Sequence, residues 1–449
     1  MALIEPRTLR GFRDYLPALM IPREYLLEKA RRVYRSYGYA PIDTPALEYL
    51  EILQGKGGAE SDKLIYSFRD HGDREVGLRF DLTVPLARFA AQHIGKLGTP
   101  FKRYHMGPVW RGENTGHGRY REFWQCDFDT IGTESNAADI ETVLVINDLF
   151  TALGFGGDGN NFVIRVNNRL ILNGFLELHD LQDKAVPILR ALDKLPKVGK
   201  TAVIDEITEA GVDRDKAHVI VRHAEMPEAI GHDRNQKILQ LITESFLRSP
   251  NQKATEGIRR LRELLSVAGK AGVPEGRIQI DLGICRGLDY YTGTIFETFL
   301  LDKPDIGSVC SGGRYDDLAG VYTKQRLPGV GASLGLDRLL AAMEEMDLLP
   351  KTATPAPVLI VQFGPEFLGE YQKMGRILRA DGIGVEVYPE AKKLGPQFKY
   401  ADQRGFKVAL IAGENEFAQG VWKLKDLAKQ EESTVPAAEV AAAVRRVLG

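Results

Sequence analysis

The feature that most constrains the fold is an interruption: strand-like sequence stops and later resumes. Runs rich in β-branched and apolar residues lie on both sides of it, FVIRVNN at 162–168 and RIQIDLGIC at 277–285. Between them, residues 176–275 are rich in Lys, Asp, Glu and Ala and follow a helical period. This arrangement predicts one discontinuous domain, 1–175 with 276–350, that carries a helical insertion.

Local signals predict the elements of the discontinuous domain. Helical spacing over 22–38 precedes YAPIDTP, whose two prolines suit an edge or interface strand. A strand that ends near Asp81 leads into a helix that opens at Thr83, and the turn ENTGHG joins two strands within 101–132. We therefore expect a mixed α/β domain.

The C-terminal part of the chain has a different rhythm. KTATPAPV at 351–358 is a Thr/Pro/Ala-rich linker, and the sequence beyond it alternates between strand and helix as far as AAEVAAAVRRVLG. The pattern predicts a linker at 351–356 and a small α/β domain with a largely parallel sheet at 357–449.

Composition limits the class of protein. Apolar residues make up 44% and charged residues 27%, and the net charge is −2, as in soluble globular proteins rather than a uniformly basic nucleic-acid coat. Cys126, Cys285 and Cys310 have neither CxxC spacing nor a His cluster, so we expect buried thiols. The N-terminus lacks the apolar run of a signal peptide, and no stretch approaches about 18 apolar residues. We expect a cytosolic protein that binds neither membrane nor DNA.

Polar side chains gather on the 101–132 hairpin. Strand alternation puts Arg111 and Glu113 on one face of the first strand. On the return strand, it puts four side chains on one face: Phe123, Gln125, Asp127 and Asp129. A face with a guanidinium, a ring, an amide and carboxylates suits a ligand with a phosphate, a flat ring and an amine. The alternative is a solvated face crossed by salt bridges.

RGLDYYTGTIFE at 286–297 places further polar groups at a strand end. Arg286, Tyr290 and Tyr291 suit a pocket wall, because strand ends with several polar aromatics usually line one. Asp289 is instead expected to pair within the sheet.

Two glycine-rich segments follow. In SGGRYDDL at 311–318, Arg314 and Asp316 are the expected partners of Asp289. GVGASLG at 329–335 has GxGxxxG spacing rather than the dinucleotide-binding fingerprint, so it is better interpreted as a glycine-packed strand that enters the helix bearing Arg338.

These motifs resemble those of histidyl-tRNA synthetases, which are class II aminoacyl-tRNA synthetases, over essentially the whole chain. RGLDYYTGTIFE and SGGRYDDL are similar to the two signature peptides of the histidine enzyme. Helix 22–38 with YAPIDTP resembles class II motif 1, PVWRGE…GRYREFWQCDFD resembles motif 2, and GASLGLDRL resembles motif 3. The resemblance implies an α+β catalytic domain with an antiparallel sheet flanked by helices, a helical insertion and a C-terminal α/β anticodon-binding domain.

The resemblance also implies the reaction. ATP and histidine would form histidyl-adenylate and pyrophosphate with Mg²⁺ present, and the aminoacyl group would pass to the 3′ end of tRNA(His), in a cytoplasmic homodimer. Arg111 and Arg286 are the implied catalytic residues on either side of the α-phosphate, where arginine stays charged and binds oxygens in a fork. The implied ATP-binding residues are Arg111, Glu113, Phe123 and Arg338. The resemblance assigns no Mg²⁺ ligand.

The implied histidine-binding residues are Asp81, Thr83, Gln125, Asp129, Arg286, Tyr290, Tyr291 and Tyr315. Among them, Asp129 and Tyr291 correspond to the imidazole contacts. A carboxylate and a phenol at the ring nitrogens would reject apolar side chains, because the polar pair would be left unsatisfied. No editing domain is therefore expected.

The chain departs from the commonest bacterial pattern in three places. RFDLTVP replaces a Glu-Gly-Thr segment and QCDFD replaces Gln…Glu, and both resemble a eukaryote-like branch. The loop ENTGHGRYRE, whose Arg119 and Arg121 are implied at the tRNA acceptor end, differs too, so reliance on the extra 5′ guanosine of the tRNA stays open.

Two other classes of protein share part of this motif pattern. Regulatory subunits of ATP phosphoribosyltransferase are non-catalytic paralogues, but they typically lack the anticodon-binding domain and the ATP-binding arginines. Here 357–449 supplies the domain, and Arg111, Arg286 and Arg338 are present. A ligase that adenylates another acid would keep motifs 2 and 3 without both tyrosine-bearing signatures.

Overall fold

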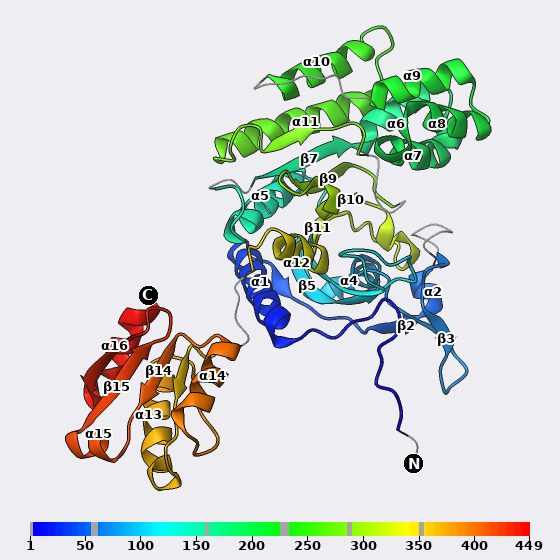
Figure 1. The fold of residues 1–449 in the computed structure, drawn as a ribbon. Helices are drawn as coiled ribbons and strands as arrows, with labels where there is room; N and C mark the ends of the chain where they lie inside the picture. The colour runs from blue at the N-terminus through cyan, green and yellow to red at the C-terminus, as the bar shows by residue number, and fades with distance from the viewer. Residues whose placement is uncertain (1–2, 55–61, 158–160, 225–232, 285–289, 350–353) are drawn as a thin grey trace. The chain divides into compact units, whose positions relative to one another are not determined.

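The computed structural model describes residues 3–54, 62–157, 161–224, 233–284, 290–349 and 354–449 (Figure 1). The chain divides into two compact units. One consists of residues 1–13 and 26–347, and the other of residues 14–25 and 348–449.

An eight-stranded sheet forms the centre of the first unit, in the order β1-β5-β6-β11-β10-β9-β7-β8. In that order the strands are Ala40–Pro41, Phe101–Trp110, Glu122–Ile131, Gly329–Gly335, Ser308–Tyr315, Thr294–Leu300, Phe162–Asn168 and Ile278–Ile280. Neighbours are antiparallel except in the two outermost pairs, β1–β5 and β7–β8. The expected antiparallel platform is confirmed, and the proline-bearing strand β1 lies at its edge, as predicted.

Helices pack against this sheet. They include α5 (Asn136–Ala152), whose first turn is capped by the side chain of Ser135, and α12 (Leu336–Glu345), which continues directly from β11. The helix α1 (Pro17–Ser36) contributes Tyr34, which is fully buried and donates its hydroxyl to the Cys126 carbonyl at 2.9 Å. GVGASLGLDRL is therefore a strand that enters a helix, as predicted.

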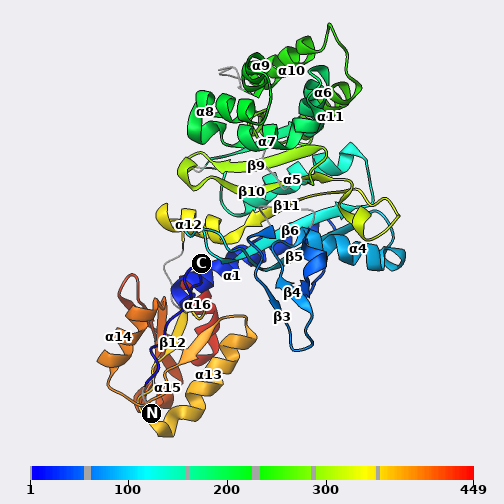
Figure 2. The ribbon, with the colours of Figure 1, turned by 90° about the vertical axis from the view of Figure 1, so that its right-hand side faces the viewer.

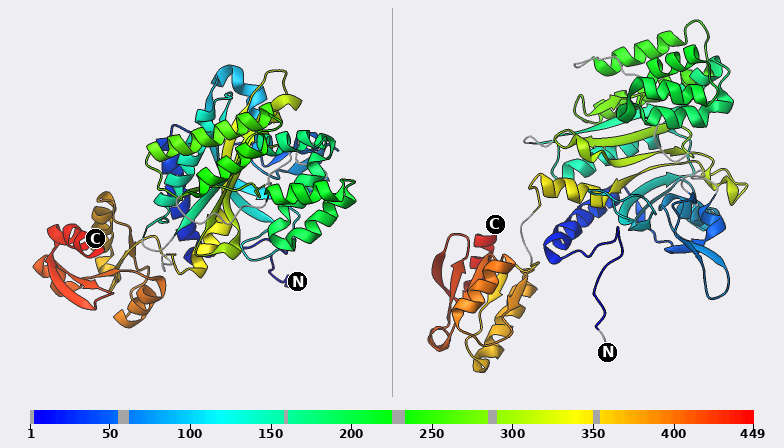
Figure 3. Two further views of the ribbon diagram at one scale, coloured as in Figure 1. Left: turned by 90° about the horizontal axis from the view of Figure 1, so that it is seen from above. Right: turned by 45° about the vertical axis from the view of Figure 1, so that its right-hand side comes forward.

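Between β7 and β8 the described residues form helices and no strand. The helices α6 to α11 are Arg169–Leu178, Ala185–Asp193, Leu195–Glu209, Arg214–Ala224, Arg234–Ser245 and Gln252–Lys270, with a 3-10 turn at Gln182–Lys184. Figures 2 and 3 show these helices, in green, together on the β7–β8 side of the sheet.

A three-stranded sheet lies early in the chain. Its order is β2-β4-β3, with strands Leu47–Tyr49, Glu75–Leu78 and Ser67–Arg69, and the short helix α2 (Leu50–Leu53) follows β2. After β4 comes α4 (Thr83–Leu97), which begins at Thr83 as predicted. The Asp81 carboxylate accepts the N–H groups of Thr83 at 3.1 Å and Val84 at 2.8 Å, so the helix start holds this acid in place.

The second unit contains a five-stranded sheet in the order β13-β12-β14-β15-β16. The strands are Val385–Val387, Val358–Ile360, Val408–Ile411, Val421–Asp426 and Glu431–Pro436. The helices are α13 to α16: Leu368–Ala380, Leu394–Arg404, Glu414–Gln419 and Val440–Leu448.

The prediction of a largely parallel sheet is wrong for its last two strands. The first three strands are parallel, but β14–β15 and β15–β16 are antiparallel. The strand β16 begins with four exposed residues in a row, EEST, so it has no apolar alternation to recognise. No helix in the described part of the chain is long and apolar enough to cross a membrane.

Candidate active site

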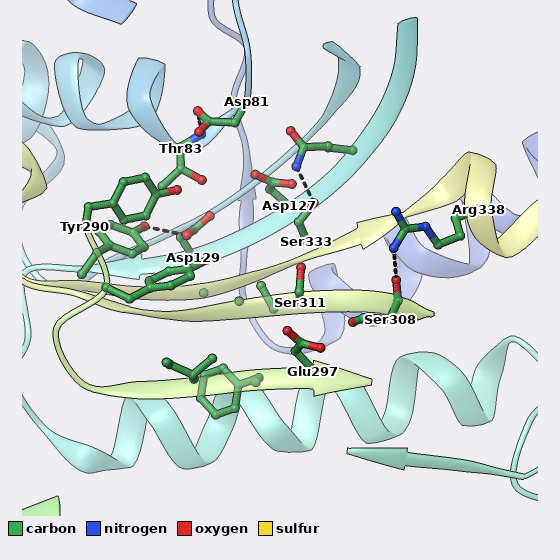
Figure 4. Close-up of a pocket in the computed structure, with 18 of the residues that line it drawn as sticks. Asp81, Thr83, Asp127, Asp129, Tyr290, Glu297, Ser308, Ser311, Ser333 and Arg338 are labelled. Carbon is green, nitrogen blue, oxygen red and sulfur yellow. Dashed lines mark hydrogen bonds between the residues drawn. The ribbon is translucent and has the colours of Figure 1, made fainter. Parts of the chain in front are cut away.

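A cavity of about 280 Å³ opens on the large sheet. Figure 4 shows polar side chains from α4, β6, β9, β10, β11 and α12 converging on this space. The sequence-predicted residues that line it are Asp81, Thr83, Arg111, Arg119, Gln125, Asp129, Tyr290, Tyr291, Tyr315 and Arg338. They come from segments more than 200 positions apart in the sequence, which strand pairing brings together.

Asp129 contacts a side chain of β10 and lies against the adjoining strand β11. Tyr315 donates its hydroxyl to Asp129 Oδ1 at 2.5 Å, and both side chains are buried. Across the β6–β11 pair, Asp129 faces Gly331, where an added Cβ would lie only 2.2 Å from Oδ1. The glycine therefore leaves room for the carboxylate, which explains part of the GVGASLG composition.

The cavity floor carries acceptor oxygens that lack donors. Among the described residues, Asp127 Oδ1 and Gln125 Oε1 are buried with no hydrogen-bond partner, and Asp129 Oδ2 accepts no aligned N–H. Burial raises the pKa of Asp127 to about 7 and raises the pKa of Asp129 and Asp81 above the usual carboxyl range. Because buried acceptors in native proteins normally find donors, this floor indicates a ligand rich in N–H groups.

Three phenols close one side of the cavity. The rings of Tyr290 and Tyr291 meet edge to face with centroids 5.1 Å apart, and those of Tyr290 and Tyr315 do so at 5.9 Å. Burial raises the pKa of all three hydroxyls above the usual tyrosine value. The phenols therefore stay protonated at neutral pH and can donate hydrogen bonds.

A second cavity, of about 160 Å³, shares several lining residues with the first and adds Glu113 and Phe123. Arg111 is fixed there: its Nε donates to the Phe80 carbonyl at 3.0 Å. Its guanidinium carbon lies 4.2 Å from the Phe80 ring centroid and 5.1 Å from that of Phe123.

The prediction that Arg111 and Glu113 lie on a strand is wrong. The strand β5 ends at Trp110. Arg111 N–H still donates to the Arg121 carbonyl across the hairpin at 2.9 Å, but Gly112 N–H donates to the Leu64 carbonyl at 2.8 Å. The two side chains nevertheless lie on the same side, with Arg111 Nη1 3.7 Å from Glu113 Oε1.

Arg338 lines both cavities. Its Nη1 donates to the Ser308 carbonyl at 2.5 Å. The preceding residue, Asp337, accepts the Trp124 N–H at 2.7 Å, which fixes the start of α12 against β6.

The N-terminal segment braces the loop at 111–121. The Gly11 carbonyl accepts the Arg121 N–H at 2.8 Å, and at φ +87° a Cβ there would lie 2.7 Å from Arg121 Cγ. Arg13 donates to the Tyr120 hydroxyl at 2.7 Å and lies over its ring at 4.4 Å. Tyr120 lines the second cavity, so the segment supports one of its walls.

The two arginines expected at the tRNA acceptor end differ in their relation to the cavities. Arg119 lines both cavities, but Arg121 lines neither, and its Nε donates to the Glu113 carbonyl at 3.2 Å. Arg286, Asp289 and Cys285 lie outside the described residues.

The sequence predicted Asp289 as the partner of Arg314 and Asp316, and that pairing lies outside the described residues. The described carboxylate partners of Arg314 are Asp316 and Asp139. Its Nη1 donates to Asp316 Oδ1 at 3.1 Å and its Nε donates to Asp139 Oδ2 of α5 at 3.0 Å. Cys126 and Cys310 are buried free thiols, as predicted.

Sequence reasoning missed several lining residues, among them the polar residues Tyr120, Glu297, Ser308, Ser311 and Ser333. Glu297 had a usable signal, because it is a lone acid in the otherwise uncharged strand TIFETFL and is only 5% exposed. The three serines carry little signal of their own, since serine is common in strands and loops alike.

Residues 11–339 match the family model described as histidyl-tRNA synthetase. The histidine–tRNA ligase of Rhodopirellula baltica is 56% identical over 434 residues, which cover 96% of each chain. The chain belongs to the histidyl-tRNA synthetase family.

Other comparisons place the whole chain within this family. Residues 357–447 match the model described as an anticodon binding domain. The histidine–tRNA ligase of Treponema denticola is 42% identical over 99% of this chain and 98% of its own. The crystal structure of the histidyl-tRNA synthetase from Nostoc sp. PCC 7120 has a TM-score of 0.87 and 35% identity, covering 99% of this chain and 100% of that one.

Proposed function

We propose that this chain attaches histidine to its cognate tRNA in two steps, through histidyl-adenylate. The observation that carries the proposal is the floor of buried acceptor oxygens beside a cationic second cavity, in a chain of this family. An amino group and an imidazole supply N–H donors to such a floor, and the arginines of the second cavity suit a triphosphate.

The histidine end is assigned to the first cavity. Asp129 and Tyr291 would bind the imidazole, with Tyr290 and Tyr315 closing the pocket. The ammonium and carboxylate of histidine would be bound by three other lining residues: Asp81, Thr83 and Gln125. Because Asp81 Oδ1 already accepts two backbone N–H groups, its other oxygen is the one assigned to the ammonium.

The first step is a displacement at phosphorus. A histidine carboxylate oxygen attacks the α-phosphorus of ATP, a new P–O bond forms, and the bond to the β-phosphate oxygen breaks to release pyrophosphate. Arg111 is fixed by the Phe80 carbonyl before substrate arrives, so it can stabilise the developing negative charge without reorganising. Arg286 is assigned to the other side of the same phosphate by family resemblance.

The remaining ATP contacts follow from the second cavity. Phe123 would stack on the adenine, with Glu113 at the edge of the base and Arg338 near the terminal phosphates. In the second step a terminal ribose hydroxyl of the tRNA attacks the histidyl carbonyl, and AMP leaves.

Mg²⁺ is expected to accompany ATP. Among the described residues no group of three or more His, Cys, Asp or Glu side chains could hold a metal ion. Mg²⁺ bound with nucleotides, however, usually needs only one or two carboxylates, with phosphates and waters as its other ligands. Glu297 of β9, opposite Ser311 of β10 in the first cavity, fits that requirement and would help to hold the ion, whose positive charge would offset that of the phosphates.

The tRNA is assigned to two parts of the chain. Arg119 and Arg121 would meet the acceptor end, and residues 357–449 the anticodon. The corresponding domains are 1–175 with 276–350 for catalysis, 176–275 as an insertion and 351–356 as a linker. We further propose a cytoplasmic homodimer that forms through the motif 1 region.

The regulatory-subunit alternative is less well supported. The curated relatives that match over nearly the whole chain are named histidine–tRNA ligases, and residues 357–447 match the anticodon-binding model. The two described arginines assigned to ATP, Arg111 and Arg338, both line the second cavity.

The test is ATP–pyrophosphate exchange without tRNA, over a panel of amino acids. Exchange should depend on histidine and on no other member of the panel. Exchange without preference among amino acids, or no exchange at all, would refute the proposal. Charging of tRNA(His) transcripts with and without the extra 5′ guanosine would then settle the role of that nucleotide.

A further inference from the structure

Arg103 is a charged side chain buried completely beneath the first cavity. Among the described residues it is one of the largest fully buried side chains, with 0% exposure. It lies on β5 directly opposite Asp129 of β6 and is not among the residues that line the cavity. Family resemblance assigned it no role.

The guanidinium of Arg103 connects two walls of the cavity. Its Nη2 lies 2.7 Å from Asp129 Oδ2 and 3.9 Å from Asp127 Oδ2. The same Nη2 donates to the Leu82 carbonyl at 3.2 Å, and Leu82 lies between Asp81 and Thr83. Among the described residues, Nε and Nη1 of Arg103 have no hydrogen-bond partner.

Burial of such a cation is costly, so its position needs a reason. The carboxylates of Asp81, Asp127 and Asp129 are also buried at this cavity, and burial favours their neutral forms. The positive charge of Arg103 favours the charged forms of all three carboxylates and so lowers their pKa values. Without it, the floor would take up protons and lose acceptor oxygens.

We propose that Arg103 is a positioning residue that determines the selectivity of the cavity for imidazole. It keeps Asp129 charged and fixed in place, and it ties that acid to the Asp81–Thr83 segment through the Leu82 carbonyl. This inference rests on the proposed function of the same site, and Arg103 itself touches no substrate.

The test compares Arg103→Met with the unaltered protein in pyrophosphate exchange. The KM for histidine should rise about tenfold or more, as expected when a buried charged partner is lost, while the KM for ATP changes less than about twofold. Discrimination against 3-(2-thienyl)alanine, an analogue whose ring has no N–H, should fall by a similar factor. Unchanged histidine KM and unchanged discrimination would overturn the inference.

A matched control separates this effect from general damage. Arg88 of α4 lies 2.8 Å from the carboxylate of Glu48, which is also buried, and neither lines the first cavity. Arg88→Met should therefore leave the KM for histidine and the discrimination unchanged. An equal loss of discrimination in Arg88→Met would show that any broken ion pair has this effect, and would also overturn the inference.

A second variant covers the case in which Arg103→Met does not fold. Arg103→Met with Asp127→Asn removes one acid along with the cation, so the buried charge is better balanced. Its KM for histidine should exceed that of Asp127→Asn alone by about tenfold. Equal values in these two variants would contradict the inference. Absence of histidine-dependent exchange in the unaltered protein would instead refute the proposed function itself.

Discussion

The hydrogen bond from Tyr315 to Asp129 offers the sharpest test of the histidine pocket. Tyr315→Phe removes one oxygen and keeps the ring, so the packing against Tyr290 is retained. The lost contact is a short bond of 2.5 Å to a carboxylate, between side chains that are 2% and 3% exposed. Water is therefore poorly placed to replace the hydroxyl.

The structure sets the size of the effect. Hydrogen bonds to charged groups contribute about 1.5–3 kcal/mol, and a buried acceptor left unsatisfied costs a similar amount. A loss of about 2 kcal/mol corresponds to about a 30-fold change in an equilibrium constant. Removal of the donor also raises the pKa of Asp129, because the Tyr315 hydroxyl lowers it.

Exchange kinetics and denaturant unfolding together measure the loss. For Tyr315→Phe we expect the KM for histidine to rise by about 10- to 30-fold, the KM for ATP to stay within about twofold, and the free energy of unfolding to fall by about 1–3 kcal/mol.

The control is Tyr322→Phe. Tyr322 packs on the same apolar cluster but donates its hydroxyl to the Ile52 carbonyl at 2.7 Å. Tyr322→Phe should lower the free energy of unfolding without changing the KM for histidine. If Tyr315→Phe kept the KM of the unaltered protein, Asp129 would not be the imidazole contact.

Three further predictions concern other parts of the site. Arg338→Met should raise the KM for ATP by about tenfold and leave the KM for histidine unchanged, since Arg338 lines both cavities but is assigned to the terminal phosphates of ATP. Equal effects on both KM values would argue against that assignment. Arg13→Met should raise the KM for ATP about threefold or more, because the contact with Tyr120 is lost. Arg7→Met, on the exposed part of the same segment, should leave the KM for ATP unchanged. Equal KM values for the two variants would contradict the proposal that this segment supports the cavity wall. Asp127 has a pKa of about 7 in the folded protein, above the unfolded value of about 3.9, so its burial costs stability as the pH rises through this window. The stability gained by Asp127→Asn, measured by urea unfolding, should therefore grow between about pH 4 and pH 7 and level off above this window, and a constant difference would contradict the raised pKa.

Much of the site could be predicted because its signals are local. Phe123, Gln125, Asp127 and Asp129 alternate along one strand, and a period of two puts them on one side whatever the rest of the chain does. All four line the cavities. GVGASLG was recognised as a strand because its spacing departs from the nucleotide fingerprint.

Other features had no local signal. Arg111 and Glu113 continue the alternation of β5 in sequence, but Gly112 donates to the Leu64 carbonyl and the chain leaves the sheet. The strand β16 pairs only at the sheet edge with four exposed residues in a row, so its sequence resembles a loop. At Gly112 a hydrogen bond to the distant Leu64 carbonyl decided the backbone path, and at β16 backbone pairing with the neighbouring strand β15 forms a strand that the side-chain pattern does not reveal.

By itself, the sequence determined the order of the elements, the family motifs and the side chains that share a strand face, because these depend on neighbours along the chain. Only the tertiary structure decided that Arg103 faces Asp129, that Tyr315 donates to it, and that Gly331 leaves it room. These contacts depend on the register of four strands drawn from both ends of the catalytic sequence. Since a one-residue slip in register would turn each side chain to the opposite face, the charge on the cavity floor is a property of the folded sheet.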